Sequence, residues 1–310
     1  MSISEISEIL IKKNNFAILT HIFPDGDAIG SSCALCLALQ KIGKNAMTVY
    51  GTEFSKKLNF VLDLVEKKEK FKPEVFISVD LSDKKLLGKF SDYKIDICID
   101  HHENNSVYAK NKYNVKSASN TENIYELLKE MKIEIDNKIA TCIYVGIATD
   151  TGRFKFSNVT KRTFEIMAEI FEKILNFSDV NYRLFENNSK NFMIFQSELI
   201  SRFEYFLDET CCILSIDLEL MDKFNVSYVE LDSISNLPLK ISGVEVGIVI
   251  KQKNENIFKV SVRSFNGEAL KICKKFGGGG HKNASGFEIT EFSDIENVKN
   301  YILKKIMTHF

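Results

Sequence analysis

The sequence predicts an α/β protein: an N-terminal parallel sheet flanked by helices, a helical linker, and a smaller C-terminal α/β domain with a mixed sheet. In the first half, short apolar runs alternate with longer segments of helical periodicity, a pattern typical of parallel sheets. Several of these apolar runs end in Asp or His. After residue 206 the pattern changes to strand-like runs rich in Val and Ile. We therefore expect a first domain over 1–185, a linker over 186–206 and a second domain over 207–310.

The strands of the first domain are predicted from apolar runs that are too short for helices. They cover residues 16–19, 45–50, 75–80 and 95–100. The helices have apolar residues at intervals of three or four, which place those residues on one face. They cover residues 3–13, 28–42, 58–65, 121–131, 136–148 and 160–175. Gly43 ends the second helix, and Gly146 weakens the last turn of the fifth.

The linker and the second domain follow from the same rules. Neither Gly nor Pro occurs between Phe154 and Pro238, so the linker is expected to be mostly helical. Strands are predicted over 212–216, 244–250 and 258–264, and helices over 269–276 and 295–307.

The composition excludes several classes of protein. The chain of 310 residues has 41 basic and 42 acidic residues and a net charge of −1, which argues against a broad cationic surface for long nucleic acids. A phosphate-bearing ligand must instead be held by a few local groups or by a metal. The N-terminus lacks a signal-peptide pattern, and no apolar run approaches the roughly 20 residues that span a bilayer. We expect a cytoplasmic protein without a membrane partner.

The seven cysteines do not suggest a disulfide framework, because their number is odd and their positions are scattered. Cys33 and Cys36 form a CxxC pattern, but they lie inside an apolar stretch. Without a second cysteine pair at zinc-binding spacing, core packing is favoured over a metal or redox site.

A short polar loop follows the first predicted strand. It contains His21, Asp25 and Asp27, and Pro24 and Gly26 force a turn within it. Carboxylates this close repel each other unless a divalent cation neutralises them or water solvates the loop. Taken alone, the loop fits a metal site and a solvated turn that caps the next helix about equally well.

Other strand ends favour the metal site. Asp80 ends one strand, Asp100, His101 and His102 end the next, and Asp150 follows a predicted helix. The carboxyl ends of parallel strands lie at one edge of a sheet, where sites form. Carboxylates and imidazoles without thiolates suit Mn²⁺, with Mg²⁺ or Co²⁺ as alternatives, better than structural zinc. So many candidate ligands suit two ions rather than one.

A run of glycines in the second domain predicts an anion site. Gly277, Gly278, Gly279 and Gly280 precede His281, and such a run can bring backbone N–H groups close to a phosphate. A flexible loop at the end of the preceding helix is the alternative, and for the run alone it is slightly favoured. Arg263 at a nearby strand end can bind phosphate with two N–H groups, which favours the anion site. The run lacks the Gly-Lys-Ser/Thr ending of a P-loop, so we exclude an NTPase.

Together these motifs resemble the DHH phosphoesterase superfamily over nearly the whole chain. The matching segments are His21-x3-Asp25-x-Asp27, Asp80 in Val-Asp-Leu-Ser-Asp, Asp100-His101-His102, Asp150 in Thr-Asp-Thr-Gly, and the glycine run with Ala284 and Gly286. The glycine segment resembles the DHH-associated C-terminal domain. The chain length and two-domain plan are most similar to the NrnA-type oligoribonucleases, or nanoRNases, of this superfamily. That branch can also dephosphorylate 3′-phosphoadenosine 5′-phosphate.

The resemblance implies a role for each matching residue. His21 and Asp25 would bind one Mn²⁺, while Asp27, His101 and Asp150 would bind the other. Asp80 would bridge both ions. His102 would face the scissile phosphate as a catalytic group, and Asp100 would orient a histidine. In the second domain the substrate-binding set would be Arg263, Ser264, Gly277, Gly278, Gly279, Gly280 and His281.

We therefore expect a Mn²⁺-dependent phosphodiesterase that converts very short single-stranded RNA and small nucleotides to nucleoside monophosphates. A phosphodiesterase for linear or cyclic dinucleotides is the alternative within the same class. An alternative of another class is a non-catalytic nucleotide sensor, although a sensor need not keep clustered carboxylates. The oligomeric state is left open, with a dimer as one option.

Overall fold

The computed structural model describes residues 1–52, 54–67, 71–102, 106 and 108–307. Contacts divide the chain into two units, Met1–Asn187 and Asn188–Phe310, each with hydrophobic clusters of its own. Among the described helices, none is both long enough and apolar enough to cross a membrane.

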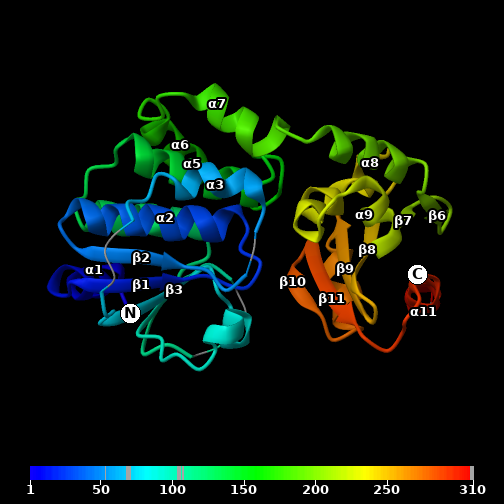
Figure 1. Ribbon diagram of the computed structural model, residues 1–310, viewed down its shortest axis with the longest axis horizontal. Coiled ribbons are helices and arrows are strands. Elements are labelled where there is room, and N and C mark those ends of the chain that lie inside the picture. Colours follow the sequence, from blue (N-terminus) through cyan, green and yellow to red (C-terminus); the bar gives the residue numbers. More distant parts are fainter. Residues whose placement is uncertain (53, 68–70, 103–105, 107, 308–310) are drawn as a thin grey trace. The chain divides into compact units, whose positions relative to one another are not determined.

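The first unit contains a five-stranded parallel sheet in the order β2-β1-β3-β4-β5. Figure 1 labels its strands β1, β2 and β3. The strands are β1 (Asn15–Leu19), β2 (Asn45–Val49), β3 (Val75–Val79), β4 (Ile97–Asp100) and β5 (Asn111–Asn114). The four apolar strands were predicted, and the parallel sheet is confirmed. Strand β5 was not predicted, because its sequence Asn-Lys-Tyr-Asn is mostly polar and it lies at the sheet edge, where polar residues are common.

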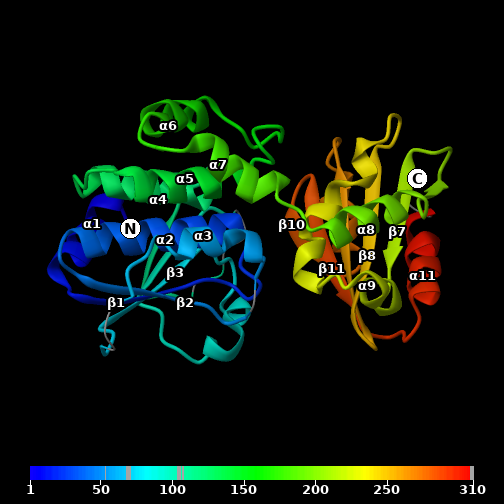
Figure 2. The ribbon, with the colours of Figure 1, turned by 45° about the horizontal axis from the view of Figure 1, so that its top comes forward.

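Long helices cover one face of this sheet, as Figure 2 shows for α2, α4 and α5. The helices are α1 (Ile3–Lys12), α2 (Gly26–Lys41), α3 (Asn59–Leu62), α4 (Asn120–Glu130), α5 (Asn137–Asp150), α6 (Lys161–Phe171) and α7 (Phe177–Asn181), with short helical turns at η1 (Lys56–Leu58), η2 (Lys84–Phe90) and η3 (Tyr182–Glu186). Alternation along β1 places Phe16 and Ile18 in the cluster under the helices. Ala17 and Leu19 belong to a smaller cluster with Leu87 of η2 on the other face.

The second unit contains a six-stranded mixed sheet in the order β10-β11-β9-β8-β7-β6, in which only β7 and β8 are parallel to each other. Its strands are β6 (Glu204–Phe206), β7 (Cys211–Ile216), β8 (Val246–Asn254), β9 (Ile257–Ser264), β10 (Gly279–His281) and β11 (Ala284–Ile289). Its helices are α8 (Lys190–Ile200), α9 (Leu218–Phe224), η4 (Tyr228–Asn236), η5 (Pro238–Lys240), α10 (Glu268–Lys274) and α11 (Ile295–Met307). This confirms the predicted mixed sheet.

Helix α8 falls within the predicted linker. It presents Phe192, Phe195 and Leu199 to a hydrophobic cluster of the second unit. These apolar residues repeat at intervals of three and four, so one face of the helix is buried. The helical segment is therefore packed as part of the second unit.

Candidate metal centre

Adjacent strands of the first unit bring the predicted ligands to one place. His21 follows β1, Asp80 follows β3, and His101 follows β4, and these three strands are neighbours in the sheet. Asp27 lies in the first turn of α2, and Asp150 is the last residue of α5. In each of three groups the ligand atoms lie within 4.8 Å of one another: His21, Asp25 and Asp80; Asp27, His101 and Asp150; Asp80, Asp100 and His102.

Asp80 lies between two histidines. Its Oδ1 is 3.4 Å from His101 Nε2, and its Oδ2 is 3.7 Å from His21 Nε2. The side chain is only 4% exposed. Asp80 also has a φ of +53°, which is uncommon for a residue with a Cβ and is typical of functional sites. Its N–H donates to Ile99 O at 3.0 Å, so the backbone holds the carboxylate between the rings.

His101 also faces the second carboxylate pair. Its Nε2 lies 3.8 Å from Asp27 Oδ2 and 3.8 Å from Asp150 Oδ2. The side chains of His101 and Asp27 are almost completely buried, with 4% and 1% exposed. A nitrogen and several carboxylate oxygens thus converge in a space from which most water is excluded.

The other ring nitrogen of each histidine fixes its orientation. His21 Nδ1 lies 2.8 Å from Ile22 O, and His101 Nδ1 lies 3.2 Å from Ser117 O. A carbonyl oxygen only accepts hydrogen bonds, so Nδ1 carries the hydrogen in both rings. In the neutral ring Nε2 then presents its lone pair to the carboxylates. Metal-binding histidines have this arrangement.

The pKa directions reflect the crowding of charges. Burial would lower the pKa of His21, but hydrogen bonding to Asp80 and the charges of Asp25 and Asp80 raise it to about 9. Burial and the charge of Asp80 raise the pKa of Asp27 to about 7. Burial and the charge of Asp27 also hold the pKa of Asp150 well above its usual range. Protons or cations must therefore balance the negative charge of this cluster.

Two carboxylate oxygens give a direct test of whether the site fits a metal. Asp80 Oδ1 and Asp150 Oδ2 are buried and have no hydrogen-bond partner among the described residues. A buried acceptor without a partner costs about 1–3 kcal/mol and needs an explanation. Oxygen and imidazole donors without thiolates suit Mn²⁺ or Mg²⁺, so the residues present fit a divalent cation.

Asp27 is held by residues that the sequence did not single out. Its oxygens accept hydrogen bonds from the N–H groups of Asn120 at 2.6 Å and Thr121 at 2.9 Å, and from the Thr121 hydroxyl. Both N–H groups belong to the first turn of α4, where the helix dipole stabilises a negative charge. The only sequence signal for Asn120 and Thr121 was their position at the polar start of a predicted helix. No local pattern connects Asn120 to Asp27, which lies 93 positions earlier.

Asp25 caps helix α2, which is one of the two roles that the sequence suggested for its loop. Its Oδ1 accepts hydrogen bonds from the N–H groups of Asp27 and Ala28, both at 3.1 Å, at the N-terminus of α2. The same oxygen lies 3.9 Å from His21 Nε2. Helix capping and proximity to the candidate ligands therefore occur together in this residue.

Asp100 and His102 form a pair beside the cluster. His102 Nδ1 lies 2.8 Å from Asp100 Oδ1, and Asp100 is completely buried. Asp100 is therefore placed to orient His102, in line with the prediction that it orients a histidine. The His102 side chain is 29% exposed, so it can be reached from solvent. A catalytic role for either residue stays a prediction.

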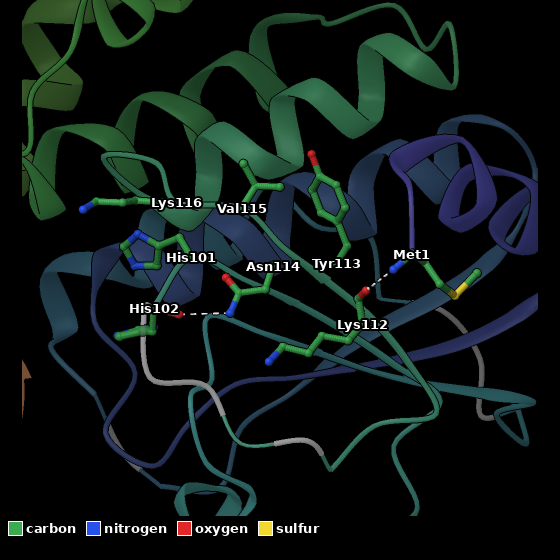
Figure 3. A pocket seen from close by; sticks show the side chains of 8 residues that line it. All are labelled: Met1, His101, His102, Lys112, Tyr113, Asn114, Val115 and Lys116. Atoms are coloured by element: carbon green, nitrogen blue, oxygen red, sulfur yellow. Dashed lines mark hydrogen bonds between the residues drawn. The ribbon is translucent and has the colours of Figure 1, made fainter.

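A cavity of about 600 Å³ lies beside these histidines (Figure 3). It is lined by the N-terminal residue, by two histidines after β4, by residues of β5 and by the two residues after β5: Met1, His101, His102, Lys112, Tyr113, Asn114, Val115 and Lys116. The cavity lies wholly within the first unit.

The first two glycines of the predicted backbone cradle in the second unit lie at the end of α10. The Gly277 N–H donates to Lys274 O at 3.2 Å, and the Gly278 N–H donates to Cys273 O at 2.9 Å. With a φ of +72° at Gly277, these bonds form a Schellman motif that ends α10. These two N–H groups therefore serve the helix end in this structure, and substrate binding by Gly277 and Gly278 stays a prediction.

The rest of the predicted substrate-binding set lies on strands or at their ends. Residues 279–281 form the edge strand β10, which pairs with β11. Arg263, at the end of β9, donates from Nε to Asn236 Oδ1 at 3.2 Å. Ser264 Oγ accepts a hydrogen bond from the Ala269 N–H at the start of α10. Substrate binding by these residues stays a prediction.

Comparisons with known proteins agree with this architecture. The model of the DHH family N-terminal domain matches residues 15–147, and the model of the DHHA1 domain matches residues 208–308. A Bacillus subtilis protein named bifunctional oligoribonuclease and PAP phosphatase NrnA is 28% identical over 290 residues, which are 90% of each chain.

Solved structures show the same fold. An exopolyphosphatase-related protein from Bacteroides fragilis superposes with a TM-score of 0.83 at 23% identity, over 98% of this chain and 95% of its own. RecJ from Thermus thermophilus in complex with Mn²⁺ superposes with a TM-score of 0.57 at 11% identity, over 99% of this chain and 54% of RecJ. The predicted α/β architecture is confirmed by these similarities.

Proposed function

The chain is a DHH-family phosphoesterase, with its DHH domain over residues 15–147 and its DHHA1 domain over residues 208–308, and from this premise we propose that it hydrolyses short oligoribonucleotides to nucleoside monophosphates with Mn²⁺ as cofactor. It also removes a phosphate from 3′-phosphoadenosine 5′-phosphate. The name of the Bacillus subtilis relative supports both activities. The net charge of −1 supports short substrates, because long strands favour a cationic groove.

The observation that carries the proposal is the pair of buried carboxylate oxygens, Asp80 Oδ1 and Asp150 Oδ2, that lack hydrogen-bond partners among the described residues. They face His101 Nε2 at 3.4 and 3.8 Å. Carboxylates that served only folding would be expected to have donors nearby. The complex of RecJ with Mn²⁺ supports the choice of ion.

The residues divide between two ions by proximity. His21, Asp25 and Asp80 would hold one ion, and Asp27, His101 and Asp150 would hold the other. Asp80 is also near the second group, because its Oδ1 lies 3.4 Å from His101 Nε2. Two divalent cations supply an acidified water and neutralise the charge of a phosphate. The protein's own part is to hold these donors in a buried pocket before substrate binds.

His102 acts on the phosphate or on the leaving oxygen. Its Nδ1 is occupied by Asp100 at 2.8 Å, so Nε2 is the atom that can donate a proton to the substrate. Burial would lower the pKa of His102, but hydrogen bonding to Asp100 and the charges of Asp80 and Asp100 raise it. This direction favours the protonated ring, in which Nε2 carries a proton. Asp100 acts through His102 as a positioning residue.

The test is an assay of purified, EDTA-treated chain on oligoribonucleotides of two to five residues and on 3′-phosphoadenosine 5′-phosphate. Mononucleotides are expected with Mn²⁺ and not with EDTA. The Asp80→Ala variant is expected to lose at least 100-fold in kcat, because it removes the carboxylate whose oxygens face both His21 and His101. Asp92→Ala is the matched control, since Asp92 is exposed and lies outside the cluster. Wild-type protein that releases no mononucleotide with any of Mn²⁺, Mg²⁺ or Co²⁺ would refute the proposal.

The same assay separates the alternatives. Faster turnover of linear or cyclic dinucleotides than of tri- to pentanucleotides would favour a dinucleotide phosphodiesterase. A sensor would bind nucleotide without turnover, and Asp80→Ala would leave its binding unchanged.

A further inference from the structure

The cavity of Figure 3 contains polar side chains that the proposed mechanism does not use. Lys112 and Asn114 of β5, and Lys116 just after it, line this cavity together with His101 and His102. A volume of about 600 Å³ lies within the range of cavities that hold small ligands. The cavity therefore provides space for a ligand directly beside the candidate metal centre.

The lysines supply the charge that a nucleotide requires here. Both lysine side chains extend toward the side of the view on which His101 and His102 lie (Figure 3). The neighbouring metal centre is rich in carboxylates, so a phosphate outside the reach of the ions needs cations from another source. Each lysine Nζ has three N–H donors, so it can contact a phosphate even where one donor already has a protein partner.

The backbone of β5 holds Lys112 and Asn114 in place at the side of the cavity. Lys112 and Asn114 are two residues apart on a strand, so they share a face of the sheet. The intervening Tyr113 lines another part of the cavity and also packs against the hydrophobic cluster under the helices. Asn114 Nδ2 donates to His102 O at 2.9 Å. This hydrogen bond connects β5 to the segment Asp100-His101-His102. Lys112 is therefore presented from a strand whose place relative to His102 is fixed, and Lys116 follows two residues after the end of that strand.

We propose that this cavity is the subsite for the nucleotide next to the scissile phosphate, with Lys112 and Lys116 contacting the following phosphate, an assignment that rests on the proposed function. The ligand is thus a single-stranded oligonucleotide of at least two nucleotides. A substrate with one nucleoside, such as 3′-phosphoadenosine 5′-phosphate, does not extend into the subsite. The lysines therefore determine preference for chain length.

The test compares Lys112→Gln/Lys116→Gln with wild type on a triadenylate and on 3′-phosphoadenosine 5′-phosphate. For the triadenylate, KM is expected to rise at least tenfold with kcat within twofold, because the lysines bind substrate rather than act on the reacting atoms. The ratio of kcat/KM for the triadenylate to kcat/KM for the small substrate should fall at least tenfold. The salt dependence of log(kcat/KM) for the triadenylate should weaken by about 0.7 per lost contact. Lys110→Gln is the matched control, because Lys110 is exposed, precedes β5 and does not line the cavity.

Several results would overturn the subsite. These are an equal loss on both substrates, no loss on the triadenylate, or the same effect from Lys110→Gln. Binding of a fluorescent triadenylate, measured by anisotropy with Mn²⁺, separates this proposal from the proposed function. If wild type turns over neither substrate but the double variant binds the triadenylate at least tenfold more weakly, the function is refuted and the subsite is supported. Equal binding by both proteins overturns the subsite.

Discussion

Asp150 lies where a carboxylate is unfavourable for folding alone. It is the last residue of α5, and the C-terminal end of a helix dipole disfavours negative charge. Burial and the nearby charge of Asp27 hold its pKa well above the usual range. A bound cation would offset the unfavourable helix dipole and lower the raised pKa of Asp150. Substitution of Asp150 therefore tests whether it is a metal ligand or a structural residue.

We predict that Asp150→Asn will be at least as stable as wild type without metal, since an amide resembles the protonated carboxyl. The variant should lose most of the rise in unfolding temperature that Mn²⁺ gives to wild type, and its kcat should fall at least 100-fold. Thermal unfolding with EDTA and with Mn²⁺ measures the first two effects. A full Mn²⁺-induced rise in the variant would show that Asp150 is not a ligand.

The Asp100–His102 pair gives a second prediction for single residues. Asp100→Asn should lower kcat about 10- to 100-fold and leave KM within twofold, because it weakens the bond that orients His102. If Asp100 acts only through His102, Asp100→Asn should have no additional effect in a His102→Gln background. Steady-state kinetics of the two single variants and the double variant measure this, and additive losses would contradict the coupling.

The sequence selected the side chains that cluster in the first unit better than the residues that hold them. Strand ends, turns and residue chemistry were enough to select His21, Asp27 and Asp80. They could not reveal that Thr121 donates to Asp27, because the two residues are 94 positions apart and each looks like an ordinary helix start. Such contacts depend on how the helices pack, which local patterns do not encode.

At the scale of elements, close packing of three helices places Asp27. A Cβ on Gly30 of α2 would lie 2.6 Å from Cys142 O and 2.8 Å from Gly146 N of α5. A Cβ on Gly146 would lie 2.7 Å from Thr121 Cβ and 2.9 Å from Asp27 Oδ1. The glycine that weakened the sequence prediction for α5 is therefore required by contact with α2 and α4.

Gly146→Ala tests this packing. Alanine favours a helix by about 1 kcal/mol over glycine, but overpacking costs about 1–3 kcal/mol. Because the extra methyl group has no space, we expect the variant to be less stable by about 1–2 kcal/mol and to bind Mn²⁺ more weakly. Urea unfolding and metal titration measure the two effects. A variant more stable than wild type would contradict the contact.

The end of α10 gives a matched pair of glycines. Gly277 has a φ of +72°, whereas Gly279 has no atom within 4 Å of an added Cβ and no positive φ. Gly277→Ala should therefore cost about 1 kcal/mol of unfolding free energy, while Gly279→Ala should change it by less than about 0.5 kcal/mol. Equal effects in urea unfolding would contradict the Schellman motif.

Edge strands mark one limit of prediction at this scale, although the interior strand β11 was not predicted either. The buried strands β1, β3 and β4 are apolar, and their sequences predicted them. Strands β5 and β10 lie at sheet edges and have polar or glycine-rich sequences. Glycine has little intrinsic preference for strands, so pairing with β11, rather than its own sequence, places the glycine run in a sheet.

For the whole molecule, the change in composition after residue 206 anticipated a second unit. The near balance of charge predicts local rather than global binding of phosphate, and this stays a prediction. The unit boundary lies at Asn187, and α8 packs into the second unit through Phe192 and Phe195. The sequence of α8 shows an apolar face but not which hydrophobic cluster receives it, so its partner had to come from the structure.

The two units have separate hydrophobic clusters, and every proposed metal ligand belongs to the first unit. Mn²⁺ should therefore stabilise the first unit selectively. At a concentration of 100 Kd, binding contributes about 2.7 kcal/mol. Amides of β1, β3 and β4 that exchange by unfolding of this unit should then exchange about 100-fold more slowly.

Hydrogen exchange of the full chain, followed by mass spectrometry with EDTA and with Mn²⁺, measures this prediction. Amides of β8 and β9 in the second unit are the internal control and should change by less than twofold, because no proposed ligand lies there. Asp150→Asn with Mn²⁺ is the matched control variant and should lack the slowing in the first unit. Equal slowing in both units would mean that the metal acts on the whole chain, and no slowing in either would mean that the clustered carboxylates do not bind it.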